Sequence, residues 1–295
     1  GPGIHWRVCA NIPSSEMELK KAALLKMPPL IYGTAWKKDR TAKLVQRAVE
    51  LGFRGIDTAC QPKHYQESGV GEALAALSKQ GIDRQKLFIQ TKYTPIGGQD
   101  ANVPYDKDAS LAEQVLQSFS KSQKNLGTDY VDSLVLHSPL ETLTKLMEVW
   151  RSMEAIYQKG GAKQLGISNC YDLAVLKQLW DKSTVKPAVV QNRFHAKTGY
   201  DRELRRWCRE KGIVYQSFWT LTANPEVLFH QSSTVRKIAK SLGRTAPQVL
   251  FRYLIQSGVC PLTGTTSEQH MKEDLEVEKF ELSKEQCTEM DQLFQ

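Results

Sequence analysis

The sequence alternates short apolar runs with longer amphipathic stretches, and this pattern recurs eight times without a linker or a break in composition. The short runs are rich in Val, Ile, Leu or aromatic residues, and several are apolar on both faces, as strands buried in a parallel sheet are. We expect strands at Pro29–Thr34, Phe53–Thr58, Leu87–Lys92, Tyr130–His137, Ala162–Ser168, Ala188–Gln191, Ile213–Phe218 and Val259–Thr263. We expect helices at Thr41–Leu51, Gly69–Lys79, Ser110–Leu126, Glu141–Lys159, Tyr171–Trp180, Arg202–Lys211, Val235–Leu242 and Ala246–Gln256. Eight strand–helix units in one chain of 295 residues predict an α/β fold, a (β/α)8 TIM barrel, rather than two domains.

The barrel is expected to occupy residues 29–295 as a single domain. Two further amphipathic stretches, Glu268–Leu275 and Ser283–Phe294, follow the last strand and predict extra C-terminal helices. Residues 1–28 are interpreted as an N-terminal extension. Its first two residues, Gly-Pro in place of a methionine, are interpreted as the remnant of a protease cleavage site.

Two classes of protein are disfavoured by the distribution of apolar residues and cysteines. No apolar stretch approaches the roughly 20 residues that a membrane-spanning helix needs, and charged residues interrupt the N-terminal region before a signal-peptide core can form. The six cysteines are far apart, with no C-x-x-C pair, which favours free thiols in a reducing compartment. We therefore expect a cytoplasmic protein without a membrane partner.

The chain carries 40 Lys+Arg against 32 Asp+Glu, a net charge of +8. These basic residues are scattered and have acidic neighbours, whereas a nucleic-acid-binding protein usually concentrates them on one face. A solvated basic surface is the favoured interpretation, and a local pocket for an anionic ligand is the alternative.

Polar residues fall where the predicted strands end, which is where a barrel builds its active site. Asp57 follows the second strand, Lys92 the third and His137 the fourth. The later strands end in Ser168, Asn169, Gln191, Phe218 and Trp219. Each could be structural alone, but together they predict one site at one end of the barrel.

Four segments give the sequence a resemblance to a known family. They are Gly55-Ile-Asp-Thr-Ala59, Val131-Asp-Ser-Leu-Val-Leu-His137-Ser, Gly166-Ile-Ser-Asn169 and Arg244-Thr-Ala-Pro-Gln-Val-Leu250. In kind, order and spacing they resemble the aldo-keto reductase family, and the resemblance extends from Leu30 to Phe294. It implies a (β/α)8 barrel and the NAD(P)H-dependent reduction of aldehydes and ketones to alcohols.

The resemblance also implies a set of site residues. The catalytic residues would be Asp57, Tyr65, Lys92 and His137. The cofactor-binding residues would be Gly33, Thr34, Asp57, Ser168, Asn169, Gln191, Phe218, Trp219, Leu221, Thr263, Ser267, His270 and Asp274. Within this set, the polar side chains at the ends of the fifth and sixth strands would bind the nicotinamide carboxamide, Phe218 would stack on its ring, and Thr263 and Ser267–Asp274 would hold the adenosine phosphate. No metal site is expected.

The chemistry of carbonyl reduction agrees with these roles. Hydride added to a carbonyl carbon leaves an alkoxide, which must receive a proton. A phenol with a pKa of about 10 is a weak acid at neutral pH. A neighbouring Lys92 ammonium would lower that pKa, and Asp57 would hold the lysine in place. His137 could donate a hydrogen bond to the carbonyl oxygen.

The proton donor itself has two candidates, Tyr65 and His64. The family usually has fewer residues between its Asp and its Tyr than the seven that separate Asp57 from Tyr65. Counting back from Glu67-x-x-Val-Gly71, a landmark that the family shares, places His64 at the tyrosine's position instead. A nearby Lys92 would push a histidine towards its neutral form but would make a phenol more acidic, so Tyr65 is favoured.

The cofactor and the substrate are less determined. The family's lysine and arginine for the 2′-phosphate correspond to Leu262 and roughly His270, with Lys272 nearby. We expect NADP(H), with a smaller preference over NADH than is common in the family, and NAD(H) is the alternative. Trp219 stands where the family has a small serine, either as core packing or as a lid.

The expected partner is a small-molecule carbonyl compound, and we expect a monomer. Substrate choice would depend on the loops Thr94–Asp108 and Ala223–Ser233 and on the C-terminal tail. If Tyr105, Phe229 and Trp219 line a pocket, they favour an apolar or aromatic substrate. The alternative function is a catalytically idle family member that binds the nucleotide as a regulatory or structural protein. A barrel hydrolase would need paired carboxylates at strand ends, and only Asp57 qualifies.

Overall fold

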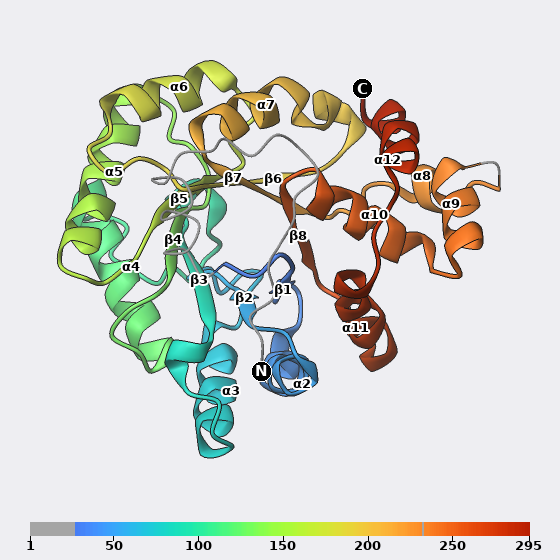
Figure 1. The fold of residues 1–295 in the computed structure, drawn as a ribbon. Coiled ribbons are helices and arrows are strands. Elements are labelled where there is room, and N and C mark those ends of the chain that lie inside the picture. The colour runs from blue at the N-terminus through green and yellow to red at the C-terminus, as the bar shows by residue number, and fades with distance from the viewer. Residues whose placement is uncertain (1–26, 232) are drawn as a thin grey trace.

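Eight short strands lie side by side in chain order and close into a parallel barrel (Figure 1). The computed structural model describes residues 27–231 and 233–295, so most of the expected N-terminal extension lies outside the described residues. The strands are β1 Ile31–Gly33, β2 Gly55–Asp57, β3 Phe88–Tyr93, β4 Ser133–Leu136, β5 Leu165–Ser168, β6 Val189–Arg193, β7 Val214–Phe218 and β8 Val259–Thr263. The ring closes where β1 pairs with β8, with Ile31 opposite Leu262 and Tyr32 opposite Thr263. The predicted (β/α)8 barrel is confirmed.

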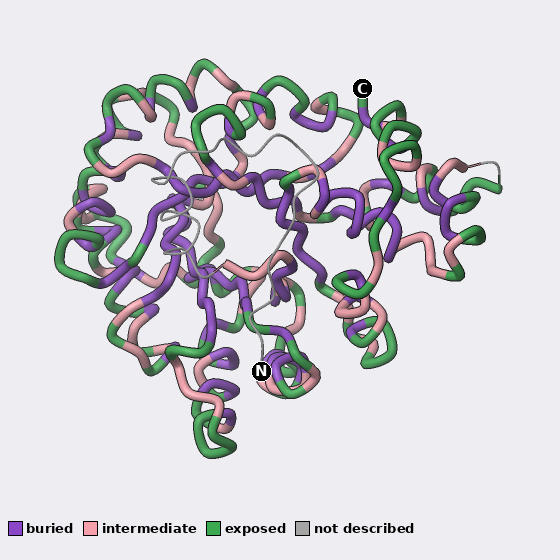
Figure 2. The backbone as a smooth tube through the Cα atoms, in the orientation of Figure 1, coloured by how far each residue is buried: buried purple, intermediate pink, exposed green. Residues whose placement is uncertain are grey.

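Helices surround the barrel and cover the outer face of the strands (Figure 1). They are α2 Thr41–Leu51, α3 Glu67–Lys79, α4 Leu111–Leu126, α5 Leu143–Gln158, α6 Leu173–Lys182, α7 Arg202–Lys211, α8 Pro225–Phe229, α9 Thr234–Leu242, α10 Ala246–Gln256, α11 Glu268–Leu275 and α12 Lys284–Asp291. The strands are therefore buried almost throughout, whereas most outer helices alternate buried and exposed residues (Figure 2). This is why the strands read as apolar on both faces in the sequence.

The predicted fourth strand, Tyr130–His137, is longer than the observed β4. Outside β4, the predicted segment pairs through a single bridge between Val131 and Ala162 and through a hydrogen bond from His137 N to Tyr93 O at 2.9 Å. At Asp132 both the backbone and the side chain take part, because Asp132 N donates to Ile89 O at 2.9 Å and Asp132 Oδ2 accepts a hydrogen bond from Ile89 N at 2.9 Å. A side-chain acceptor replaces the ladder carbonyl there, so the regular strand starts one residue later.

One helix was not expected from the sequence. The segment expected as a loop, Ala223–Ser233, contains α8, which starts at Pro225. The preceding Asn224 is buried and donates from Nδ2 to Phe194 O at 2.7 Å and to Thr220 O at 2.9 Å. The side chain that anchors this segment to the barrel thus lies directly before the helix.

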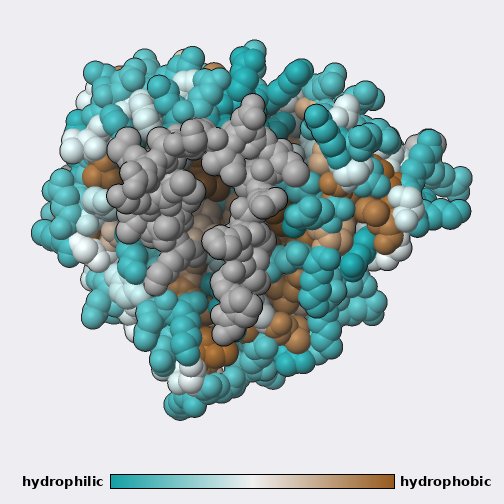
Figure 3. Space-filling model, viewed as in Figure 1, coloured by the Kyte–Doolittle hydropathy of each residue, from teal (hydrophilic) through white to brown (hydrophobic). Residues whose placement is uncertain are grey.

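The face shown in Figure 3 is largely hydrophilic, with smaller hydrophobic patches between the hydrophilic residues. Within the described residues, no helix is both long enough and apolar enough to cross a membrane.

Candidate active site

A cavity of about 780 Å³ opens at the ends of the barrel strands and brings together most of the residues predicted for the site. Of those residues, its lining contains Gly33, Thr34, Asp57, Tyr65, His137, Ser168, Asn169, Gln191, Phe218, Trp219, Leu221, Thr263 and His270. Lys92, Ser267 and Asp274 are outside the lining. The strand ends therefore meet at one site, as a barrel requires.

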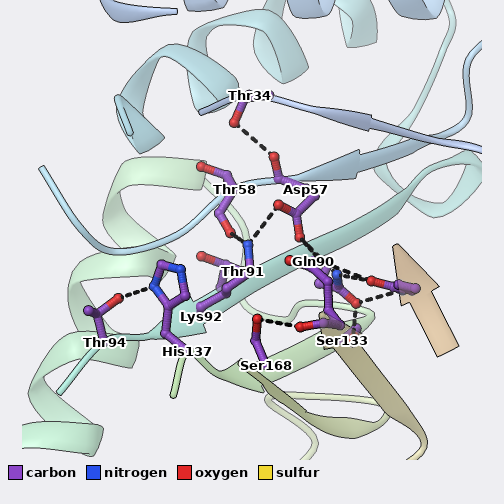
Figure 4. A network of polar contacts seen from close by, with 12 residues as sticks. Thr34, Asp57, Thr58, Gln90, Thr91, Lys92, Thr94, Ser133, His137 and Ser168 are labelled. Atoms are coloured by element: carbon purple, nitrogen blue, oxygen red, sulfur yellow. Dashed lines mark hydrogen bonds and ion pairs between the residues drawn. The ribbon is translucent and has the colours of Figure 1, made fainter. Parts of the chain in front are cut away.

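Lys92 and Asp57 form a buried ion pair beneath the cavity (Figure 4). Lys92 is 1% exposed, and its Nζ lies 2.7 Å from Asp57 Oδ1. The same ammonium donates to Thr58 O at 2.9 Å. Burial works to lower the pKa of Lys92, but Asp57 and Tyr65 outweigh it and raise that pKa above its ordinary value. The lysine is therefore held charged and in one position.

Three glutamines fix the other side of Asp57. Asp57 Oδ2 accepts hydrogen bonds from Gln90 Nε2 at 2.8 Å and from Gln191 Nε2 at 3.0 Å. The same two amides donate to Gln216 Oε1 at 2.7 and 2.9 Å. Gln90 and Gln216 were not predicted from the sequence. Both are buried polar residues within apolar strand segments, and such residues need hydrogen-bond partners, which is the feature that could have identified them.

Tyr65 lies over Lys92. A turn in which Tyr65 N donates to Gln61 O at 2.9 Å absorbs the extra residues of the loop after β2. Lys92 Nζ is 5.0 Å from the centroid of the Tyr65 ring, and the Tyr65 and His137 rings are 6.0 Å apart. His64 also lines the cavity, but its ring packs on that of Trp36, with ring centroids 4.0 Å apart.

Lys92 lowers the pKa of this phenol as expected, but burial has the larger effect. Burial raises the pKa of Tyr65 above its ordinary value of 10, while Lys92 acts in the opposite direction without cancelling the effect. The phenol is therefore held protonated, and Lys92 reduces the cost of its ionisation.

His137 lies beside Tyr65 as a neutral imidazole. Burial and the positive charge of Lys92 hold the pKa of His137 well below its ordinary value. Its Nδ1 lies 2.6 Å from Thr94 Oγ1 (Figure 4). If this hydroxyl donates to Nδ1, the ring proton is on Nε2 and is free to be donated.

Hydrogen bonds within the site fix the positions of the residues predicted to bind a carboxamide, Ser168, Asn169 and Gln191. Ser168 Oγ donates to Gln191 O at 2.7 Å, and Asn169 Nδ2 donates to His137 O at 2.9 Å. Gln191 uses its amide nitrogen on Asp57 and Gln216, so its Oε1 has no protein donor among the described residues. An amide oxygen at the cavity wall with the Phe218 ring nearby fits a flat ring that carries a carboxamide.

The opposite side of the cavity, between β8 and β1, is lined by Lys37, Gly264, Thr265 and His270. Lys37 Nζ donates to Gly264 O at 2.5 Å. Sequence reasoning missed this lysine and favoured Lys272, which is exposed and pairs with Glu268 at 3.3 Å. The donors on this side fit phosphate, but none of them is the planar fork of an arginine.

The two remaining predicted residues on this side have structural contacts. Ser267 caps α11, because its Oγ accepts from His270 N at 3.2 Å. Asp274 is buried and accepts from Thr263 Oγ1 at 2.7 Å, and burial raises the pKa of Asp274 to about 7.

The aromatic residues of the loops are placed differently from expectation. Trp219 is 44% exposed and lines the cavity, so the core-packing interpretation is wrong. Tyr105 is buried and donates to Thr94 O, whereas Phe229 is exposed, and neither lines the cavity. The sequence-based argument for an aromatic substrate therefore retains only Trp219.

Comparison with known proteins agrees with this geometry. The sequence profile of the Aldo/keto reductase family matches residues 29–295. An uncharacterized oxidoreductase from Bacillus subtilis is 31% identical over 84% of this chain and 82% of its own length. A glyoxal reductase from the same species is 29% identical over 86% of this chain and 84% of its own. The crystal structure of an aldo-keto reductase enzyme from a deep-sea metagenome library covers 91% of this chain and 92% of its own, with a TM-score of 0.78 and 26% identity. A profile match over the whole barrel, on a chain whose strand ends converge on one cavity, shows that the protein belongs to the aldo/keto reductase family of oxidoreductases.

Proposed function

We propose that this protein reduces an aldehyde or ketone to the alcohol, with NADPH as the preferred cofactor and Tyr65 as the proton donor. The observation that carries the proposal is the position of Tyr65, which lies over the Lys92–Asp57 pair and beside His137. A glyoxal reductase is among the relatives, so small aldehydes are the first substrates to test.

When bound, the nicotinamide cofactor supplies the hydride. Tyr65 and His137 then orient the carbonyl oxygen by donating hydrogen bonds to it. As negative charge develops on that oxygen, Tyr65 gives up its proton and becomes a phenolate. The Lys92 ammonium stabilises this phenolate, and Asp57 keeps the ammonium in place.

Lys37, Thr263 and His270 are the residues proposed to hold the 2′-phosphate of the cofactor. A lysine and a hydroxyl bind phosphate without the bidentate geometry of arginine, so we expect a modest preference for NADPH over NADH. Titration of the protein's tryptophan fluorescence with each cofactor measures this preference. Equal or tighter binding of NADH would remove the phosphate site from the proposal.

The test of the activity follows NADPH oxidation with glyoxal and a panel of aldehydes. Tyr65→Phe should lower kcat by at least about a hundredfold, since it removes the general acid. His64→Ala changes the adjacent residue, which packs on Trp36, and should have a much smaller effect. Both variants should bind NADPH as the wild type does. The opposite ranking would make His64 the acid, and binding of NADPH without turnover of any carbonyl would indicate an idle family member.

We also propose a monomeric, cytoplasmic enzyme. The thiols of Cys60, Cys170, Cys208 and Cys260 are unpaired and buried, as is usual in a reducing compartment. Light scattering of the purified protein measures its oligomeric state.

A further inference from the structure

Arg193, the last residue of β6, has a guanidinium group without an anionic partner. Its Nε is buried and has no hydrogen-bond partner in the described part of the chain. No carboxylate among residues 27–231 and 233–295 forms an ion pair with it. Leaving a buried donor unpaired is costly, so such a group at a cavity wall indicates a ligand.

Two aromatic rings hold this guanidinium in place. Its Cζ lies 4.2 Å from the centroid of the Trp219 ring and 5.9 Å from that of Phe218. Stacking occupies the face of the guanidinium but leaves its two terminal amino groups, Nη1 and Nη2, free to donate two parallel hydrogen bonds. Two parallel donors match the two oxygens of a carboxylate.

Arg193 is on the side of the cavity mouth that carries His137. Tyr171 OH accepts from Arg193 N at 3.0 Å and donates to Asn169 Oδ1 at 3.1 Å. Asn169 in turn donates to His137 O. Lys37 and His270, the residues proposed for phosphate, belong to the β8–β1 side instead.

The charge of the cavity also favours an anion. Lys37 and Arg193 are the lysine and the arginine in its lining, and Asp57 is the only carboxylate there among the described residues. Asp57 is already neutralised by Lys92. The cavity therefore carries uncompensated positive charge at two separated places, and the phosphates of the cofactor account for one of them.

We propose that Arg193 binds a carboxylate on the substrate, so that the enzyme prefers carbonyl compounds that carry a negative charge, such as carboxylated aldehydes and 2-oxo acids. This inference rests on the proposed carbonyl reduction and adds the substrate class. Arg193 acts on binding, and the proton still comes from Tyr65.

The test uses two aldehydes of the same shape, 4-carboxybenzaldehyde and its neutral counterpart 4-nitrobenzaldehyde. The wild type should have the lower KM for the carboxylate. Arg193→Gln should raise that KM by about tenfold or more, the usual effect of losing a hydrogen bond to a charged group, while the KM for the nitro compound changes little. Arg193→Lys should raise the KM for 4-carboxybenzaldehyde less than Arg193→Gln does.

Two control variants separate the site from general charge effects. Arg206→Gln removes an exposed arginine outside the cavity and should leave the ratio of the two KM values unchanged. Lys37→Gln should weaken NADPH binding without changing that ratio.

A second readout does not need turnover. Calorimetric titration of the cofactor-free protein with 4-(hydroxymethyl)benzoate should show weaker binding to Arg193→Gln than to the wild type.

Three results would overturn the inference. Arg193→Gln could raise the KM for both aldehydes equally, or it could leave both KM values unchanged. It could also weaken NADPH binding, which would assign the arginine to a cofactor phosphate. Failure of the proposed function looks different, because the wild type would then reduce neither aldehyde while the calorimetric comparison still reports on Arg193.

Discussion

Lys92 and Asp57 depend on each other for burial, and this makes the pair sensitive to the loss of one partner. Lys92→Met leaves the Asp57 carboxylate buried without its cation, which costs on the order of 3–5 kcal/mol in the free energy of unfolding. It also removes the charge beside Tyr65, so turnover should be abolished while NADPH binding persists. Urea unfolding, cofactor titration and kcat measure the three effects.

The double variant Asp57→Asn/Lys92→Met separates the two consequences. With both charges removed, stability should return in part, but turnover should not. The exposed Lys177→Met on α6 is the surface control and should change stability by less than about 0.5 kcal/mol. Wild-type kcat in Lys92→Met would remove Lys92 from the mechanism.

The site residues that could be predicted from the sequence are those that lie at the ends of strands. Asp57, Lys92 and His137 follow from the barrel topology, because a strand end determines where its side chain lies. Lys37 was not predictable, since a loop lysine among many surface lysines is distinguished by its contacts with Gly264 and Ala35 and by its place in the cavity lining. The choice between His64 and Tyr65 depends on the turn at Gln61, which residue types alone do not specify.

Among the elements, α3 and α4 approach each other closely at Gly71. A Cβ on Gly71 would overlap Asn125 O and lie 3.1 Å from Leu126 Cα. Gly71→Ala should therefore lower the free energy of unfolding by about 1–3 kcal/mol or more, although alanine is the better helix former. Gly97→Ala is the matched control, because a Cβ there meets nothing within 4 Å. Thermal or urea unfolding compares the two, and equal stability would contradict the close packing.

All eight strands and the longer helices between them could be predicted, because burial on both faces or on one face leaves a clear periodicity. What could not be predicted are short elements that depend on tertiary anchors. The five-residue α8 is tied to the barrel by Asn224, and the loop after β3 contains a single 3-10 turn at Ile96–Gly98. Such segments are too short for a periodic pattern to show.

For the whole molecule, two buried groups give stability opposite dependences on pH. Asp274 has its pKa raised to about 7 by burial, so it stays protonated in the folded state while the unfolded carboxyl ionises. The contribution of Asp274 to the free energy of unfolding is therefore lost as pH rises from about 4 to 7, by at most about 1.4 kcal/mol per pH unit. His137 has a lowered pKa and therefore the opposite effect. Its contribution to the free energy of unfolding is lost as pH falls below about 6.5.

Asp274→Asn isolates the first effect, because His137 is the same in both proteins. Asparagine does not ionise, so the stability of the variant relative to the wild type should increase between pH 5 and 8. Urea unfolding at several pH values measures this difference. Parallel curves for the two proteins would show that Asp274 is not protonated in the folded state.

The pairing of β1 with β8 joins two ends of the domain that leave the ribosome far apart in time. Strand β1 starts at Ile31 and its partner β8 ends at Thr263. At a synthesis rate of about 5–20 residues per second, β1 waits roughly 10 to 50 seconds for that partner. During translation its free edge is open to pairing with other nascent chains, and its length of only three residues limits that risk.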